Sequence, residues 1–563
     1  MPDDSAGVQG GEDENFFSPE PEPKRQVEPA LQVCRYLLEM FSVPLLRSHA
    51  TVSLVDRDRL QFYHANRSVI LVSSAINFSK GDGKDKFIAT IIAFHCLSLE
   101  QNGILETIVP KNAELLSKSK HRQKGQVAQN GNKLHFFKNE KHESFEVELT
   151  DAISRDPAMV GRSTVVLNAT SKKWPKVKLV VKISWPTSGR VSETDFLKKA
   201  SAMAEGDHGW AANHLPRVYY AEDVVFHPDS TLESVAHLFE NAEFANGDYV
   251  YERRTLRIII QERLYPLKSL TNVKEIGQVF LDVACSTYIS PASQTPPAYP
   301  SLVHRWLYEH PGILHRDLSF NNIMCRLVKE KNDKGSQEQK VYGVLTDYDL
   351  SSWTDSLKPD YTKTSQQRTG TPPYMAHELL QGTSPIHLYR HDVESLFYIM
   401  LLMAARHTIG TPKKEKVPRV LMRGSTGLPY QKWFNEQDYD TLGSLKETFF
   451  SKTKAIELSP VFEDFRPWLK SLQRCFSKGF SLKSSISDED VPEWMDAMTA
   501  TGVELATVQF DDATLGGNVK YSTLIAAVPH LTGELKGLVI RGPQSSPVPA
   551  SSSPAGAARV DTG

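Results

Sequence analysis

The segment LHRDLSFNNIM, at residues 314–324, constrains this chain more than any other feature of its sequence. Asp317 and Asn322 stand five positions apart and follow directly on His315 and Arg316. Transfer of a phosphoryl group from ATP needs a carboxylate that accepts a hydroxyl proton and an amide oxygen that binds magnesium. A rigid loop that carries Asp317 and Asn322 supplies both groups. An Asp and an Asn at this spacing mean little alone, but the His-Arg pair before them makes the pattern specific.

Three further segments follow this motif. GVLTDYDLSSW, residues 343–353, places Asp347 directly after a predicted strand, where a carboxylate can bridge a metal ion to phosphate oxygens. An isolated Asp at a strand end is more often a turn former, but the position of Asp347 after the first motif reverses that expectation. RTGTPPYMAHELL, residues 368–380, comes next, and then HDVESLFYIMLLMAA, residues 391–405. There Asp392 begins an apolar helix and is placed to cap free backbone amides.

The composition is that of a globular protein with balanced charge. Lys and Arg total 65 against 67 Asp and Glu, which argues against a general nucleic-acid binder or a polybasic membrane binder. The five cysteines are far apart and have no metal-ligand spacing, so reduced thiols are expected. The acidic N-terminus has no secretory signal, and no apolar run is long enough to span a membrane. We therefore expect an intracellular protein, cytoplasmic or nuclear, that is not secreted.

Hydrophobic periodicity predicts a strand-rich half followed by a helix-rich half. The N-terminal region should hold a helix over 30–46, a hairpin over 51–78 with its turn at 64–66, and a buried helix over 87–99. Residues 111–142 are basic and polar, and a solvated loop or hairpin is favoured over a charged recognition face. The segments that follow are predicted as strands at 165–169, 178–184, 217–225 and 256–262 and as helices at 192–205 and 273–283. This order predicts an α+β protein with two lobes and a cleft between them.

With these segments in this order, the chain resembles the fungal-type protein kinase domain family of the protein-kinase-like superfamily. DRDRLQFYHANRSVILVSSAINFS, residues 56–79, resembles the N-terminal extension of that family. The resemblance implies a bilobal fold with a β-rich small lobe, a helical large lobe, an N-terminal α/β extension and disordered tails. The divisions expected are an acidic tail at 1–28, the extension at 29–156 packed on the small lobe, the small lobe at 157–262, the large lobe at 263–480, an unassigned C-terminal extension at 481–540 and a Pro/Ser tail at 541–563.

The resemblance also implies roles for particular residues. Asp317 matches the catalytic base, and Asn322 and Asp347 match the ligands of Mg²⁺. Thr371, in GTPPY, matches the residue that steers the substrate hydroxyl toward Asp317. The cofactors implied are ATP and Mg²⁺.

Nucleotide-binding positions follow from the same resemblance. Lys182, in KLVVKISWP, matches the lysine that binds the α- and β-phosphates, with Glu193 as its partner on the next helix and Glu205 as an alternative. Gly161, in AMVGRSTVV (residues 158–166), is the single glycine in the loop expected to cover the phosphates. The hinge is expected near residues 261–264, where the backbone around Glu262 would pair with adenine.

The sequence departs from the usual kinase pattern at several positions. Asp347-Tyr348-Asp349 replaces Asp-Phe-Gly, and Asp349 lacks the backbone freedom of glycine. Ser319 stands where serine/threonine kinases carry a lysine that contacts phosphate, and His377 stands where a proline is usual. No proton acceptor or metal ligand is lost, so a competent enzyme is favoured over a pseudokinase.

Three functions remain open from sequence. The first is an ATP-dependent serine/threonine protein kinase with a protein substrate, no nucleic-acid partner and no membrane span. The second is a small-molecule kinase of the aminoglycoside or choline type, which lacks a segment like RTGTPPYMAHELL. The third is a non-catalytic scaffold that uses the same fold for binding.

Regulation and one structural ion pair are also undecided. Arg316 suggests a basic pocket for a phosphate on the activation segment, which carries Thr362, Thr364 and Ser365. An unmodified, packed segment is equally compatible with the sequence. The partner of Glu378 is expected to be Arg466 or Arg474.

Overall fold

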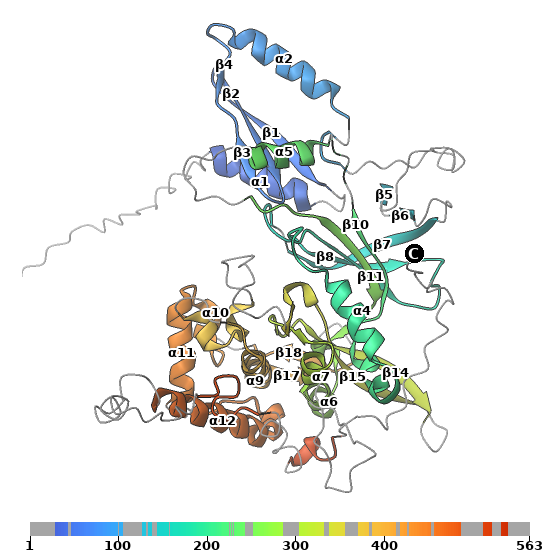
Figure 1. The fold of residues 1–563 in the computed structure, drawn as a ribbon, viewed down its shortest axis with the longest axis vertical. Helices are drawn as coiled ribbons and strands as arrows, with labels where there is room; N and C mark the ends of the chain where they lie inside the picture. The colour runs from blue at the N-terminus through green and yellow to red at the C-terminus, as the bar shows by residue number, and fades with distance from the viewer. Residues whose placement is uncertain are drawn as a thin grey trace, which may run out of the picture.

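The structure is a mixed fold of helices and sheets in which every strand pairing is antiparallel (Figure 1). The computed structural model describes residues 29–42, 47–98, 101–104, 127–130, 133–137, 144–156, 158–224, 226, 228, 230–241, 251–284, 303–331, 337–354, 370–381, 386–412, 417–424, 427–451, 455–485, 510–520 and 531–538. Both predicted tails and the candidate phosphorylation sites at 362–365 lie outside these residues. Figure 1 shows a small N-terminal sheet at the top, a larger sheet in the middle and a helix-rich region below.

The N-terminal region forms its own small core. Helix α1 (Pro29–Ser42) buries Val33, Leu37 and Phe41 at helical spacing, and these side chains pack with Ala50 and Tyr63 of the sheet. The sheet has the order β1-β2-β3, with β4 paired to β2, and its strands are β1 (His49–Asp56), β2 (Arg59–Asn66), β3 (Ile70–Val72) and β4 (Ile76–Asn77).

The predicted hairpin is present, but the predicted position of its turn is wrong. Residues 64–66 are paired with β1, and the chain reverses instead at Arg57 and Asp58. Arg57 has a φ of 53°, a left-handed conformation that a non-glycine residue rarely adopts. A second turn follows β2, where the side chain of Asn66 accepts hydrogen bonds from the amides of Ser68 and Val69.

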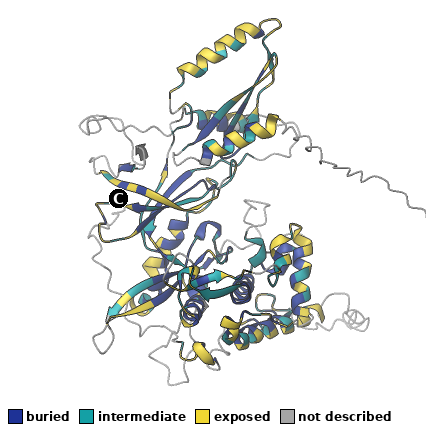
Figure 2. Ribbon diagram, turned by 180° about the vertical axis from the view of Figure 1, so that it is seen from behind, coloured by how far each residue is buried: buried dark blue, intermediate teal, exposed yellow. Residues whose placement is uncertain are grey.

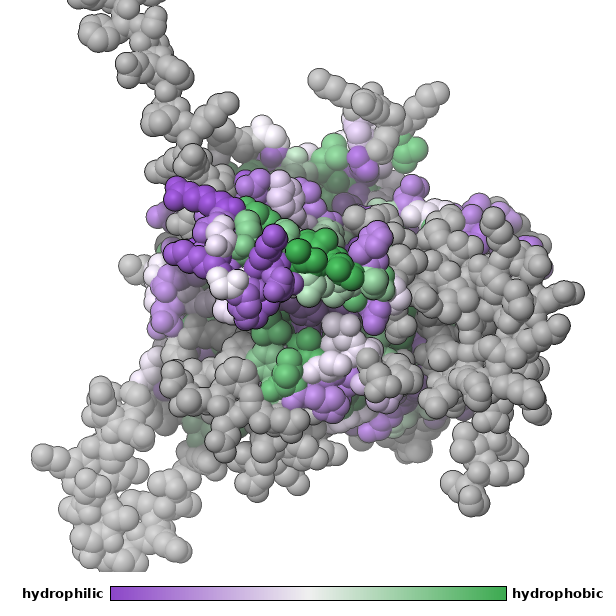
Figure 3. Space-filling model, turned by 90° about the horizontal axis from the view of Figure 1, so that it is seen from above, coloured by the Kyte–Doolittle hydropathy of each residue, from purple (hydrophilic) through white to green (hydrophobic). Residues whose placement is uncertain are grey.

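The predicted second helix is present, but it is exposed rather than buried. Helix α2 (Gly83–Cys96) contacts the sheet through Phe87 and Phe94, whose rings lie against Phe78 and Phe62. Figure 2 shows most of α2 in the colour of exposed residues. Figure 3 views the molecule from the α2 end and shows hydrophobic side chains beside strongly hydrophilic ones on that face. The large exposed apolar side chains of the helix are Ile88, Ile91 and Ile92.

The central sheet has seven strands in the order β10-β11-β9-β8-β7-β6-β5. Two adjacent inner strands, β9 and β11, are mostly apolar and almost wholly buried, so both faces of the sheet are covered there. The predicted strands correspond to β8, β9, β10 and β11, and residues 127–137 of the basic segment add β5 and β6 at one edge. The bounds are β5 (Val127–Asn130), β6 (Lys133–Phe137), β7 (Ser144–Arg155), β8 (Val165–Thr170), β9 (Leu179–Ser184), β10 (Val218–Val224) and β11 (Leu256–Glu262).

Helices α4 (Glu193–Met203) and α5 (Thr231–Asn241) belong to the part of the chain that builds the central sheet. The S-x-x-D pattern of residues 192–195 predicts an N-cap at Ser192, with Asp195 completing a capping box. Ser192 caps α4 as predicted, because its hydroxyl accepts a hydrogen bond from the amide of Thr194 at 3.3 Å. The capping box expected with Asp195 is replaced by an ion pair between Asp195 and Lys198 at 3.2 Å.

The helix-rich region is built around α9 (Tyr389–Arg406), which is buried over nearly its whole length (Figure 2). Its apolar side chains belong to one large core with the buried face of α6, which carries Ile276, Val279, Phe280 and Val283. The other helices of this region are α6 (Val273–Ala284), α7 (Val303–Glu309), α8 (His377–Leu380), α10 (Gln431–Asn435), α11 (Tyr439–Ser451) and α12 (Arg466–Ser485).

Short antiparallel sheets complete this region. Strands β14 and β15 form a long antiparallel pair, and β15 ends at Leu345, directly before Thr346, which positions Asp347. The strands are β12 (Tyr265–Pro266), β13 (Ile313–Leu314), β14 (Ile323–Lys331), β15 (Gln337–Leu345), β16 (Ser352–Trp353), β17 (His407–Gly410) and β18 (Arg419–Met422).

Two C-terminal segments pack into the same core. Leu515 and Val519 of residues 510–520 and Leu531 and Leu535 of residues 531–538 are buried with the side chains of the helix-rich region. Among the described residues, Cys34, Cys96 and Cys325 are free thiols. Among the described helices, none combines the length and apolar character that crossing a membrane requires.

Candidate active site

The loop between β13 and β14 brings the first two candidate residues together. The side-chain amide of Asn322 donates a hydrogen bond of 2.8 Å to the backbone carbonyl of Asp317, and both side chains are largely buried. The imidazole of His315 bonds to the carbonyl of Thr346 at 3.0 Å and so ties this loop to the residue before Asp347. The loop is therefore fixed relative to the end of β15.

Asp392, in the first turn of α9, holds the same loop through hydrogen bonds to its backbone. Its Oδ2 atom accepts hydrogen bonds from the amides of His315 and Arg316 at 3.2 and 3.1 Å, so it caps this loop rather than its own helix. Two imidazoles, of His304 and His387, also contact the carboxylate at 2.9 and 2.8 Å. Burial would raise the pKa of Asp392, but the two histidines hold it well below its ordinary value. The negative charge persists inside the core and keeps the loop in place.

Lys182 lies at the centre of a buried cluster of carboxylates. Its Nζ atom is 2.9 Å from Glu193 Oε2, 2.8 Å from Asp347 Oδ1 and 2.9 Å from Asp349 Oδ2. Glu193, the first residue of α4, is thus the partner of Lys182, and Glu205 follows the helix at its other end. The contact with Asp349 was not anticipated, because a position usually held by glycine carries no charge to pair with.

The protonation states in this cluster follow from its charges. Burial opposes the charge on Lys182, but the three carboxylates raise its pKa well above the ordinary value. Burial and the nearby charge of Asp349 raise the pKa of Glu193 to about 7. Burial also acts against ionisation of Asp347, yet Lys182 lowers the pKa of that carboxyl to about 2. Asp347 is therefore fully ionised near neutral pH.

The same cluster has the donor atoms that a cation prefers. Carboxylate oxygens of Glu193, Asp347 and Asp349 lie within 4.8 Å of one another. Glu193 Oε1 and Asp349 Oδ1 are buried and accept no hydrogen bond from the residues that the structure describes. Asp347 itself has a left-handed backbone, with φ 66° and ψ 73°, that turns the chain into the short helix at Tyr348–Leu350. Hard divalent cations such as Mg²⁺ take oxygen ligands of this kind.

Asp317 has the environment of a proton acceptor. Burial, followed by the charge of Asp347, raises the pKa of Asp317 to about 6. Its Oδ1 atom accepts a hydrogen bond of 3.3 Å from the hydroxyl of Thr371. The structure therefore brings Thr371 to Asp317 across 54 residues of chain. A carboxylate with a raised pKa takes up a proton more readily than an exposed one.

The segment that carries Thr371 is held by a lysine for which the sequence predicted no role. Lys446 of α11 is fully buried, and its ammonium group donates hydrogen bonds to the carbonyls of Pro372 and Met375 at 2.9 and 2.6 Å. It also lies over the ring of Tyr398 at 4.6 Å. Burial lowers the pKa of Lys446 to about 7. A lone lysine in an amphipathic helix gives no sequence signal for such a role.

Gly161 lies in the connection between β7 and β8, next to the strand that carries Lys182. Its φ of 116° is a conformation open to glycine, and a Cβ atom there would meet no atom within 4 Å. Ser163, two residues later, also has a positive φ of 42°. The loop thus makes a sharp turn beside the carboxylate cluster.

Glu262 does not direct its side chain toward the cluster. Its carboxylate forms an ion pair with the buried Arg326, and its amide donates to the carbonyl of Arg217 at 3.0 Å. Neither group is therefore available to a nucleotide. The role of Glu262 in the structure is to fasten β11 to β14, which links the central sheet to the helix-rich region.

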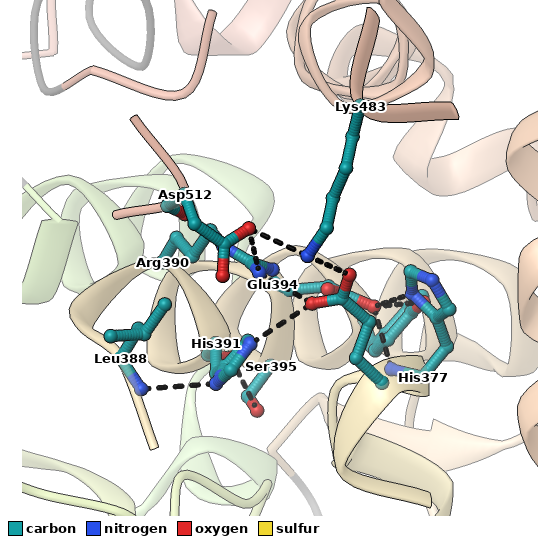
Figure 4. A network of polar contacts seen from close by, with 10 residues as sticks. His377, Leu388, Arg390, His391, Glu394, Ser395, Lys483 and Asp512 are labelled. Atoms are coloured by element: carbon teal, nitrogen blue, oxygen red, sulfur yellow. Dashed lines mark hydrogen bonds and ion pairs between the residues drawn. The ribbon is translucent and has the colours of Figure 1, made fainter. Parts of the chain in front are cut away.

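The predicted partners of Glu378 are wrong. Arg390 and Lys483 pair with its carboxylate at 2.5 and 2.9 Å, and His391 donates to it at 3.2 Å. Burial would raise the pKa of Glu378, but these neighbours hold it far below its ordinary value. Figure 4 shows Arg390, His391, Lys483 and Asp512 in this network. Arg466, one of the expected partners, pairs instead with Glu463.

His377 occupies the position where a proline was expected and makes a contact that proline cannot. Its amide and its Nδ1 atom both bond to the buried carboxylate of Glu394, at 2.9 and 3.0 Å (Figure 4). Its ring packs edge-on against Phe480 at 4.4 Å between centroids. The substitution therefore joins α8 to α9 and α12.

Comparison with models of protein families shows which family the chain belongs to. The model described as fungal protein kinase matches residues 19–263 and 302–404, more than half of the 563 residues. The chain belongs to the fungal protein kinase family. No curated protein matches the chain significantly.

The candidate site lies within the residues that the family model matches. Lys182, Glu193, Asp317, Asn322 and Asp347 all fall inside the matched ranges. Residues 56–79, which resemble the N-terminal extension, fall inside them too. Lys446 and the C-terminal segments lie beyond residue 404, so they are features of this chain outside the match.

Proposed function

We propose that this protein kinase transfers the γ-phosphate of ATP to serine or threonine hydroxyls of a protein substrate. The observation that carries the proposal is the convergence of Lys182 with Glu193 and Asp347, which lie 11 and 165 residues away along the chain. In this proposal the central sheet is the small lobe and the helix-rich region is the large lobe of a bilobal kinase. ATP binds where the carboxylate cluster and the loop of Asp317 meet.

The residues that would hold the nucleotide and the metal are present in suitable protonation states. Lys182 would bind the α- and β-phosphates, since its charge is retained in the buried cluster. Asn322 and Asp347 would hold Mg²⁺, because amide and carboxylate oxygens are the ligands this ion takes and Asp347 is ionised. Bound Mg²⁺-ATP supplies the phosphoryl group and screens its charge.

The proton of the acceptor hydroxyl passes to Asp317 in this proposal. A pKa of about 6 leaves its carboxyl ionised at neutral pH and still basic enough to accept a proton. The hydroxyl of Thr371 holds one oxygen of Asp317 and leaves the other for the substrate. The carboxylate of Asp392 accepts hydrogen bonds from the backbone amides of His315 and Arg316, which keeps the loop in position while the proton moves.

A polypeptide acceptor is favoured over a small molecule by the segment 371–378. Lys446 supports the backbone of this segment at two carbonyls, and His377 and Glu378 anchor its end in α9 and α12. A rigid segment 371–378 beside Asp317 can support an extended polypeptide substrate whose hydroxyl must reach this carboxylate. A small-molecule kinase and a non-catalytic scaffold remain the alternatives that experiment must separate.

The test is phosphate transfer from labelled Mg²⁺-ATP to a degenerate peptide library, with an aminoglycoside and choline as competing acceptors. We expect label on serine and threonine peptides and none on the small molecules. Label on the small molecules alone would identify a small-molecule kinase. ATP binding without any transfer would favour the scaffold.

A further inference from the structure

The loop that connects β7 to β8 is fastened on its outer side to the N-terminal region. Arg67, in the turn after β2, donates a hydrogen bond of 2.5 Å from its Nη1 atom to the carbonyl of Ala158. In return, the carbonyl of Arg67 accepts a hydrogen bond of 2.9 Å from the amide of Gly161. These contacts join segments that are 91 residues apart in the chain.

Arg67 is itself held rigidly. Its side chain is buried, and its guanidinium group lies over the ring of Phe41 at 4.1 Å. The preceding residue, Asn66, fixes the turn by accepting amide hydrogen bonds at 2.8 and 2.9 Å. Met159 of the loop packs against the same small core of α1, β1 and β2. The outer side of the loop is thus part of the N-terminal core.

The inner side of the loop presents a second arginine to the candidate active site. The Nη1 atom of Arg162 lies 4.0 Å from Asp349 Oδ2, and its side chain keeps 36% of its surface exposed. Burial raises the pKa of Asp317 and Asp347, and the positive charge of Arg162 opposes this effect and favours their ionised forms. The carbonyl of Arg162 accepts a hydrogen bond of 2.7 Å from the amide of Trp185, which fixes the loop beside β9.

The charges at the site indicate what Arg162 can do there. Lys182 is surrounded by three carboxylates, so its single charge is already outweighed. Mg²⁺ bound with ATP offsets part of the triphosphate charge, and a further cation beside the carboxylates would stabilise the terminal phosphate. Ser319, in the catalytic loop, carries no charge. Arg162 is partly exposed, lies within reach of the acidic residues and is carried by the loop above them.

We propose that the N-terminal region is a built-in positioning element of the active site. Arg67 sets the place of the loop at 158–163, and the loop sets Arg162 over the terminal phosphate of ATP. Arg162 is then a catalytic residue, and Arg67 is a positioning residue that acts through it. This inference rests on the proposed function, because it assigns both arginines to the nucleotide of that reaction.

The test is a double-mutant cycle in the full-length protein. Arg67→Ala and Arg162→Ala should each lower kcat by about 10- to 100-fold, because small displacements of a charged group are costly in transfer reactions. The double variant should lose no more than Arg162→Ala alone, since Arg67 acts through Arg162. Arg67→Lys, which keeps a donor for Ala158, should recover part of the rate. Arg59→Ala, on the exposed part of β2, is the matched control and should behave as wild type.

A readout independent of activity accompanies the cycle. Hydrogen exchange at residues 158–163 should be slowed by Mg²⁺-ATP in the wild type and should be faster in Arg67→Ala than in Arg59→Ala. Thermal unfolding of each variant shows whether it is folded. Fully additive losses, or an unchanged kcat and unchanged exchange in a folded Arg67→Ala, would overturn the inference. A wild type that neither binds ATP nor transfers phosphate would contradict the proposed function as well.

Discussion

The carboxyl group of Asp317 is subject to opposing influences at the scale of single residues. Burial and Asp347 raise its pKa, whereas Arg162 and the hydrogen bond from Thr371 lower it, and the result is about 6. The carboxyl group is therefore ionised at neutral pH but titrates just below it. The activity of the kinase should report this balance directly.

We predict that kcat/KM rises with pH below about 6, by about tenfold per unit, and is level above it, because only the ionised base accepts a proton. Thr371→Val removes a hydrogen bond that favours the ionised form, so the midpoint should move to higher pH. Thr371→Ser keeps the hydroxyl and should keep the midpoint. A midpoint unchanged in Thr371→Val would show that this bond does not act on Asp317.

A second prediction at the scale of single residues concerns Lys446 and the pH dependence of the free energy of unfolding. Its pKa is lowered by burial to about 7, so above this pH the unfolded chain binds more protons at this lysine than the folded one. The folded state therefore gains stability as pH rises from about 7 toward the ordinary lysine value, by at most about 1.4 kcal/mol per pH unit. Urea unfolding of wild type and Lys446→Met at about pH 7 and about pH 9 measures this change.

The difference in unfolding free energy between wild type and Lys446→Met should shift in favour of the wild type at the higher pH. Lys432→Met, at an exposed position of α10, is the matched control and should show no such shift. A pH-independent difference for Lys446→Met would mean that the ammonium group stays charged in the folded protein.

At the scale of elements, helices α2 and α9 represent two extremes of burial. Helix α9 is buried on all sides, whereas α2 touches its sheet through two phenylalanines and leaves Ile92 58% exposed. We predict that the amides of α2 exchange with solvent orders of magnitude faster than those of α9, because few buried contacts oppose local opening. Equal protection of the two helices in native-state hydrogen exchange would mean that another surface covers α2 in solution.

Local patterns predicted the elements whose burial matches their periodicity. Strand β11 was predicted at its observed bounds, and α6 differs by one residue at its end, because both have regular apolar spacing and bury most of their residues. The N-cap of α4 at Ser192 was also predicted, since a cap depends on adjacent residues alone. The same reasoning failed for α2, because apolar content does not say which face another element will cover.

Interactions between distant residues could not be predicted in this way. Lys483 reaches Glu378 across 105 positions, and Lys446 reaches Met375 across 71, so no local pattern records either contact. The turn at Arg57 and Asp58 was not predicted, because neither residue is the glycine or asparagine that marks most tight hairpin turns. The candidate site was accessible from sequence only where residue type and spacing together specify chemistry, as in the loop of Asp317 and Asn322.

At the scale of the whole molecule, the C-terminal segments are part of the main core. Leu515 is completely buried, and a Cβ atom added at Gly479 of α12 would lie 2.6 Å from its side chain. Asp512, three residues earlier, pairs with Arg390 and Lys483 at 2.9 and 2.6 Å (Figure 4). The network of Glu378 is therefore completed by a segment that follows the last long helix.

We predict that Leu515→Ala lowers the free energy of unfolding by about 2–5 kcal/mol, the cost of a large-to-small change in a packed core. Val461→Ala, at a site that is 38% exposed, should cost much less. Denaturant unfolding of the two variants checks the comparison. Equal, small losses would mean that residues 510–520 pack only loosely on α12.

The whole molecule also explains why the active site needs so much of the chain. The central sheet supplies Lys182, the helix-rich region supplies Asp317 and Asp392, and the N-terminal region holds the loop of Arg162 through Arg67. Each part has its own buried core, and charged contacts join them at the site. Phosphoryl transfer is the chemistry that this joined arrangement supports best.

The most direct test of that claim compares wild type with Asp317→Asn in the same pair of assays. Transfer of labelled phosphate from Mg²⁺-ATP to a peptide acceptor should fall by about 100-fold or more in the variant, because it loses its proton acceptor. ATP affinity, measured by calorimetry, should stay close to that of wild type, because Lys182 and Asp347 are intact. Equal transfer by the two proteins, or a wild type that binds no ATP, would contradict the account.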